Sequence, residues 1–108
     1  MDIERLRGHC IAKPDVTEDF PFGPDTLVFR VKEKLFALCD VGEFDGINLK
    51  CDPERAIDLR ERYAGITPGY HMNKKHWNTV STDGSVPDKL ILDLVDHSYA
   101  LVSATARR

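Results

Sequence analysis

Apolar residues recur every three to four positions in three stretches of the chain, and each stretch predicts an amphipathic helix. The first follows Asp2, a favourable N-cap residue, and ends before Pro14. The second begins at residues 52–54, Asp-Pro-Glu, which combine an N-cap, a proline at the first helical position and an acid in the first turn. The third carries its apolar stripe over residues 90–102. The pattern therefore predicts a helix near each end of the chain and one near its middle.

Three other stretches alternate between apolar and polar residues, which is the pattern of a half-buried strand. They cover residues 26–31, 35–39 and 47–51, and the polar turn at residues 32–34 joins the first two as a hairpin. A further strand is predicted at residues 77–80. The order of predicted elements is thus helix, three strands, helix, one or two strands, helix.

This order indicates an α+β fold. Consecutive strands with short connections pair antiparallel, and the helices must bury their apolar stripes against one face of the sheet. We therefore expect a two-layer sandwich, an antiparallel sheet with helices on one face. Residues 15–25 are predicted to be a loop, because they include two prolines and a glycine. The length of 108 residues is that of one domain, which would cover residues 1–108.

The composition is that of an ordinary soluble globular protein, with 42% hydrophobic and 31% charged residues. No apolar run approaches the roughly 20 residues that a membrane helix needs, so no membrane partner is expected. The net charge of −3 counts against a dedicated nucleic-acid binder unless the basic residues gather on one face. Three cysteines without close pairing do not form a disulfide framework, and Cys39 and Cys51 are interpreted as core residues of a cytoplasmic protein.

The stretch from Gly69 to Val80 is the densest cluster of functional side chains. It holds two of the four histidines, the only tryptophan, a lysine pair, two asparagines and a tyrosine. His71 and His76 lie five positions apart and have no cysteine nearby, whereas a zinc site needs three or four protein ligands. No metal, cofactor or catalytic residue is therefore expected. No activated thiol or nucleophile motif is present either, so the protein is expected to be non-enzymatic.

Binding of an anion or a nucleic acid is the favoured interpretation of this cluster. Lysine offers a point charge to phosphate, and asparagine can contact base edges. The hairpin turn with Lys32 and Lys34 supplies a second basic segment. Trp77 is interpreted as a core residue in preference to one that stacks on a base. The predicted nucleic-acid-binding residues are Lys32, Lys34, Asn73, Lys74, Lys75 and His76.

Three segments of the chain together resemble the MmcQ/YjbR family of small bacterial proteins. They are residues 21–25 (PFGPD), 47–53 (INLKCDP) and 67–80 (TPGYHMNKKHWNTV). The resemblance implies an α-β(3)-α-β(2)-α sandwich, with one more strand near residues 66–71. It also implies a protein that binds double-stranded DNA through two β-hairpin turns, which here are residues 32–34 and 73–75.

Two alternatives to DNA remain open. The fold also resembles secretion-chaperone domains, which implies a protein or peptide partner. A small-molecule site is the other alternative, with Tyr70, His71 and Trp77 lining a pocket together with Asn73 and His76. A concave pocket with convergent polar groups would favour the small-molecule site.

Overall fold

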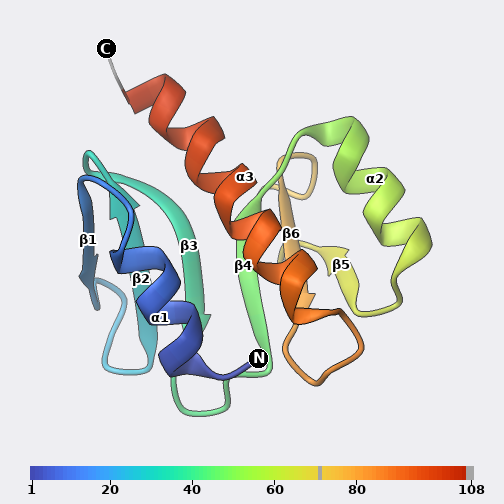
Figure 1. The fold of residues 1–108 in the computed structure, drawn as a ribbon, viewed down its shortest axis with the longest axis horizontal. Helices are drawn as coiled ribbons and strands as arrows, with labels where there is room; N and C mark the ends of the chain where they lie inside the picture. The colour runs from blue at the N-terminus through green and yellow to red at the C-terminus, as the bar shows by residue number, and fades with distance from the viewer. Residues whose placement is uncertain (71, 107–108) are drawn as a thin grey trace.

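The computed structural model describes residues 1–70 and 72–106 of the chain, without the side chain of residue 106. Within these residues, three helices and six strands follow one another in the predicted order (Figure 1). The first strand is additional to those predicted. In chain order they are α1 (Ile3–Ile11), β1 (Val16–Asp19), β2 (Thr26–Val31), β3 (Lys34–Asp40), β4 (Gly46–Lys50), α2 (Pro53–Arg62), β5 (Ile66–Pro68), β6 (Trp77–Ser81) and α3 (Asp88–Ala106).

The strands form one antiparallel sheet in the order β1-β2-β3-β4-β6-β5. Helix α3 packs across β2, β3 and β4, α1 flanks it beside β1, and α2 covers β5. All three helices lie on the same side of the sheet (Figure 1). The predicted α+β fold, a two-layer sandwich with helices on one face, is therefore confirmed. Among the described helices, none has the length and apolar character needed to cross a bilayer.

Strand β1 lies inside the segment that was predicted to be a loop. Val16 is its only apolar residue, and the prolines and glycine that break regular structure come only after Asp19. The strand exists because β2 offers it a partner edge, with Val16 opposite Val31 and Asp19 opposite Val28. Arg7 of α1 also holds it, through a two-pronged ion pair to the Glu18 carboxylate with N–O distances of 2.5 to 3.1 Å.

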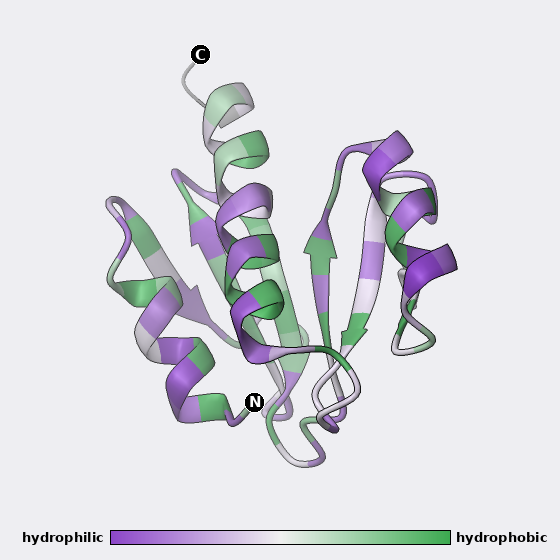
Figure 2. Ribbon diagram, turned by 45° about the vertical axis from the view of Figure 1, so that its right-hand side comes forward, coloured by the Kyte–Doolittle hydropathy of each residue, from purple (hydrophilic) through white to green (hydrophobic). Residues whose placement is uncertain are grey.

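The core fills the space between the sheet and the helices. Phe29, Phe36 and Ile91 are among its largest fully buried residues. The ring of Phe36 meets the ring of Tyr99 on α3 edge to face, with a centroid distance of 5.5 Å. Helix α2 contributes less, since Figure 2 shows it largely hydrophilic and its buried residues are Ala56 and Leu59.

The three cysteines are free thiols in this core, which confirms the interpretation of Cys39 and Cys51 as core residues. Burial raises the pKa of Cys39 to about 12. Burial, with a smaller contribution from the neighbouring Cys39, raises the pKa of Cys10 to about 12 as well. These thiols are therefore protonated at neutral pH.

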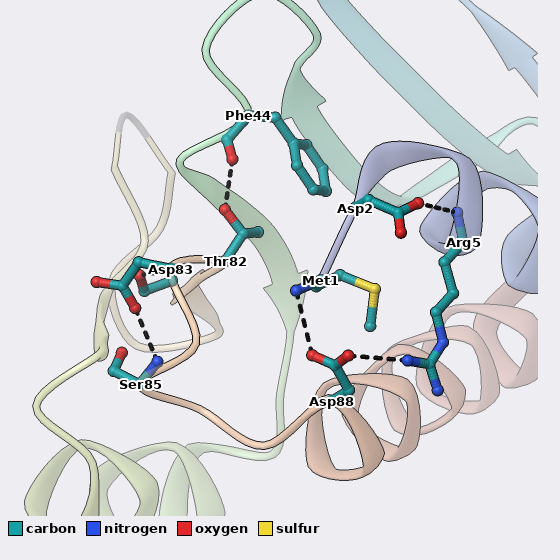
Figure 3. A network of polar contacts seen from close by, with 9 residues as sticks. Met1, Asp2, Arg5, Phe44, Thr82, Asp83, Ser85 and Asp88 are labelled. Carbon is teal, nitrogen blue, oxygen red and sulfur yellow. Dashed lines mark hydrogen bonds and ion pairs between the residues drawn. The ribbon is translucent and has the colours of Figure 1, made fainter.

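A polar network ties the start of α1 to the start of α3 (Figure 3). Asp88 accepts from the Met1 ammonium group at 3.2 Å and from Arg5 at 2.8 Å. Asp2 accepts from the backbone N–H of Arg5 at 2.8 Å, as an N-cap should. In the adjoining loops the Thr82 hydroxyl donates to the Phe44 carbonyl. The contacts of Asp88 therefore join the two helices, and the Thr82 bond holds the β3–β4 loop against the segment that follows β6.

Candidate functional site

The two turns predicted to bind DNA lie at the same end of the sheet. Val31 pairs with Lys34 across the β2–β3 turn, and Lys50 pairs with Trp77 at the point where β4 ends and β6 begins. Because β3 and β4 run antiparallel, the start of β3 and the end of β4 share one end of the sheet. The centres of the β2–β3 and β5–β6 hairpins are three strand spacings apart, about 14 Å. In Figure 1 both turns lie at the upper end of the sheet.

The β2–β3 turn projects its charges outward. Lys32 and Glu33 have φ angles of 50° and 73°, the left-handed conformation of a two-residue hairpin turn. Lys32, Glu33 and Lys34 are all exposed. Within the described part of the chain, neither lysine forms an ion pair. Their charges are therefore available to a partner.

The β5–β6 connection is built differently, because its polar groups bond to one another. Asn73 Oδ1 accepts from the backbone N–H of Lys75 at 2.9 Å and of His76 at 3.3 Å. The Lys74 ammonium group donates to the Gly69 carbonyl at 3.2 Å. The ammonium group of Lys75, by contrast, is exposed and forms no hydrogen bond or ion pair within residues 1–70 and 72–106. His76 is half-buried.

Arg60 of α2 holds this connection in place, and the sequence reasoning did not single it out. Its Nε donates to Asn78 Oδ1 at 2.7 Å, and its Nη2 donates to the carbonyls of Lys74 and, at 3.3 Å, Trp77. Asn78 is buried, and its Nδ2 has no partner within the described residues. The available signal was spacing, since Arg60 is four residues after the buried Ala56 and so lies on the inner face of α2.

Trp77 does not belong to the core, so its interpretation as a core residue is wrong. Strand β6 turns Asn78 and Val80 toward the helices, and alternation therefore turns Trp77 to the opposite face. There it is half-buried and pairs across strands with Lys50. Lys50 adds a further cation to the end of the sheet that carries the two turns.

The face of the sheet without helices is hollowed. The hollow has a volume of about 1210 Å³, and its floor is formed by β3, β4, β6 and β5. The exposed rings of Phe22 and Tyr70 belong to its lining, so one residue of the predicted pocket lies here. Trp77 is not part of that lining. His71, the third predicted pocket residue, lies outside the described residues.

The floor of the hollow carries a short polar chain. The Tyr70 backbone N–H donates to Thr79 Oγ1 at 3.0 Å, and that hydroxyl donates to Asn48 Oδ1 at 2.5 Å. Among the described residues no three His, Cys, Asp or Glu side chains converge as a metal site would require. Because these polar groups are hydroxyl and amide groups, their chemistry is hydrogen bonding to a bound molecule.

Comparisons with known proteins place the chain in a family. The family model named YjbR matches residues 11–101. The chain is 38% identical over 100 residues to uncharacterized protein YjbR of Escherichia coli K12, covering 92% of this chain and 85% of that protein. It is 41% identical over 102 residues to uncharacterized protein YbdF of Escherichia coli O157:H7, with coverages of 92% and 82%.

Solved structures agree with these sequence matches. The crystal structure of Deinococcus radiodurans protein DR2400 superposes with a TM-score of 0.94 at 41% identity, over 99% of this chain and 82% of that one. A Pseudomonas syringae protein superposes with a TM-score of 0.81 at 33% identity, over 94% of this chain and 99% of that one. The family model, the sequence identities and the superpositions agree, and the chain therefore belongs to the YjbR family.

Proposed function

We propose that this protein binds double-stranded DNA through the basic end of its sheet, without catalysis. The observation that supports this best is the placement of both turns at one end of the sheet, with Lys50 between them. The two hairpin centres are about 14 Å apart, close to the roughly 12 Å width of the major groove of B-DNA. Each turn would then contact the phosphates of one strand.

The charge distribution supports a contact at this end despite the net charge of −3. Exposed Lys32, Lys34 and Lys75 gather there, whereas the β3–β4 loop at the other end carries Glu43 and Asp45. The net charge of −3 counts against nucleic-acid binding only as an average over the whole chain, and it does not describe the charge at one end of the molecule. Cys10 and Cys39 are buried and protonated at neutral pH, which supports a protein without a thiol nucleophile, and the three free cysteines fit a reducing cytoplasm.

The expected contact is to the DNA backbone and not to the bases. Asn73, the predicted base-reading residue, uses its side-chain oxygen inside its own turn. If lysines neutralise about four phosphates, a plot of the logarithm of the binding constant against the logarithm of the salt concentration should have a slope of roughly −3 to −4. Fluorescence anisotropy on a labelled duplex, titrated at several salt concentrations, measures both the affinity and this slope.

A matched pair of variants tests the location. Lys34→Ala/Lys75→Ala should lower the magnitude of the slope by about 2, since each lysine accounts for roughly 0.9. Arg62→Ala/Lys89→Ala removes two exposed cations outside both turns and should leave the slope unchanged.

Glu33→Gln should tighten binding of DNA, because that carboxylate lies between Lys32 and Lys34. Undetectable binding at 50 mM salt, or equal effects of the two double variants, would refute the proposal.

A further inference from the structure

The open face of the sheet is apolar and acidic, whereas the two turns are basic. Its hollow, described above, is lined by apolar groups from several elements, among them Leu38 on β3 and Met72 in the β5–β6 connection. Phe22 and Tyr70 in the lining are 69% and 68% exposed. Large apolar side chains held this far out of the core at one hollow are typical of a surface that is covered by a partner.

Acidic side chains occupy one end of this hollow. They are Asp40, Glu43, Asp45 and Asp83, all exposed. Asp40 Oδ1 accepts from the backbone N–H groups of Gly42 and Glu43, which fixes its position at the rim. None of these carboxylates has an ion-pair partner within residues 1–70 and 72–106.

The described lining contains no lysine, arginine or histidine. Among the described lining residues, no cation therefore compensates the negative charge of the hollow. An anionic ligand such as the DNA backbone would be repelled here, and a cationic one attracted. The hollow and the basic end of the sheet thus favour partners of opposite charge.

The dimensions favour a peptide over a compact small molecule. The volume of about 1210 Å³ exceeds the roughly 300–1,000 Å³ of typical small-molecule pockets. Strand β3 crosses the floor from Leu35 to the acidic end at Asp40, a length of about 17 Å at 3.3–3.4 Å per residue. An extended segment of about five residues spans that length.

We propose that the open face of the sheet binds a short extended peptide segment in which a run of large apolar residues adjoins a run of lysines or arginines. The apolar residues lie against Leu38 and the exposed aromatic rings, and the cations lie against Glu43 and Asp45. The acidic end of the hollow lies at the end of the sheet opposite the two basic turns, so the cations of the peptide bind away from the proposed DNA contact.

Fluorescence anisotropy with a fluorescein-labelled peptide of sequence LFLKRK tests this directly. The charge-reversed peptide LFLEDE is the first control, and unlabelled spermidine is a competitor that carries charge without apolar groups. We expect LFLKRK to bind, LFLEDE not to bind, and spermidine to compete at least tenfold more weakly than unlabelled LFLKRK. No binding of LFLKRK at 1 mM protein in low salt, or equal binding of both peptides, overturns the proposal.

Variants locate the site on the open face. Glu43→Lys/Asp45→Lys should weaken binding of LFLKRK tenfold or more, whereas Glu54→Lys/Glu61→Lys on α2 makes the same change in net charge and should alter it less than twofold. Phe22→Ala should weaken it at least threefold, and thermal melts check that each variant is folded. Equal effects of the two lysine pairs would overturn the proposal. Lys34→Ala/Lys75→Ala should leave peptide binding intact, so failure here and failure of DNA binding are distinguishable.

Discussion

The hydroxyl of Ser98 donates to the carbonyl of Phe36 at 2.6 Å, and the same oxygen accepts from the backbone N–H of Lys50 at 2.9 Å. The last paired residues of β3 and β4 at this end are Ala37 and Leu49, so Phe36 and Lys50 lie one position beyond the ladder. A side chain of α3 therefore bridges the two strands where their own ladder ends. The bridge lies beside the end of β4, which places Lys50 next to the basic turns.

Replacing Ser98 by alanine should lower the free energy of unfolding by about 1–3 kcal/mol, because it leaves a buried carbonyl and a partly buried N–H unpaired. Urea denaturation followed by circular dichroism measures the change. Ser103→Ala on the same helix is the control and should stay within about 0.5 kcal/mol of wild type. A Ser98→Ala variant as stable as that control would show that the bridge contributes little to the stability of the fold.

Replacing Arg60 by alanine should loosen the β5–β6 connection. Asn78 Oδ1, which is buried, and the carbonyls of Lys74 and Trp77 would lose their shared donor. We expect a loss of about 1.5–3 kcal/mol of unfolding free energy, the range for hydrogen bonds from charged groups. Hydrogen exchange should also quicken at the Trp77 amide, which donates to the Asn73 carbonyl.

Arg62→Ala is the matched control for Arg60. Arg62 is exposed and pairs with Asp58 one turn earlier on α2, a contact worth about 0.3–0.5 kcal/mol. If both arginine variants lose the same small amount, Arg60 does not organise the connection.

The stability of the protein should fall as the pH drops below about 6.5, in part through His97. Burial, followed by the nearby Arg55 charge, lowers the pKa of His97 from 6.5, while Asp52 and Asp93 act weakly in the opposite direction. The ring accepts from the Asp52 N–H at 3.1 Å, which only a neutral nitrogen can do. Below pH 6.5 the unfolded chain therefore binds the proton first, and the free energy of unfolding decreases.

Denaturation of wild type and His97→Gln at pH 7.5 and pH 5.5 measures this contribution. The loss of stability between the two pH values should be smaller in the variant, since the other titrating groups are common to both proteins. Identical losses would mean that His97 binds its proton equally well in the folded and unfolded states.

Thiol reagents should react slowly with the folded protein. With a pKa of about 12, Cys10 and Cys39 have a thiolate fraction at pH 8 that is on the order of a thousandfold below that of an ordinary cysteine. Burial also raises the pKa of Cys51. Absorbance with Ellman's reagent should show little reaction in buffer and three rapidly reacting thiols in guanidinium. Rapid native labelling of Cys10 or Cys39 would contradict their burial.

The helices could be predicted because their signals are local. Asp2 and Asp52 each accept from a backbone N–H three residues later, so the sequence alone carries the start of α1 and α2. The alternation of β2, β3 and β4 follows in the same way from which residues avoid water. Strand β1 escaped prediction, because its four residues are held by pairing with β2 and by Arg7.

The candidate sites depend on contacts that the order of residues does not reveal. The sequence determined where charge and aromatic groups occur, and so identified both basic turns. Only the tertiary structure decided that the turns share one end of the sheet, that Trp77 faces away from the core, and that Arg60 and Ser98 link segments 18 and 62 residues apart. The hollow also arises only there, because strands from both halves of the chain form its floor. The physical reason is that side-chain alternation is fixed within a strand, whereas the neighbours of a strand are fixed by long-range pairing.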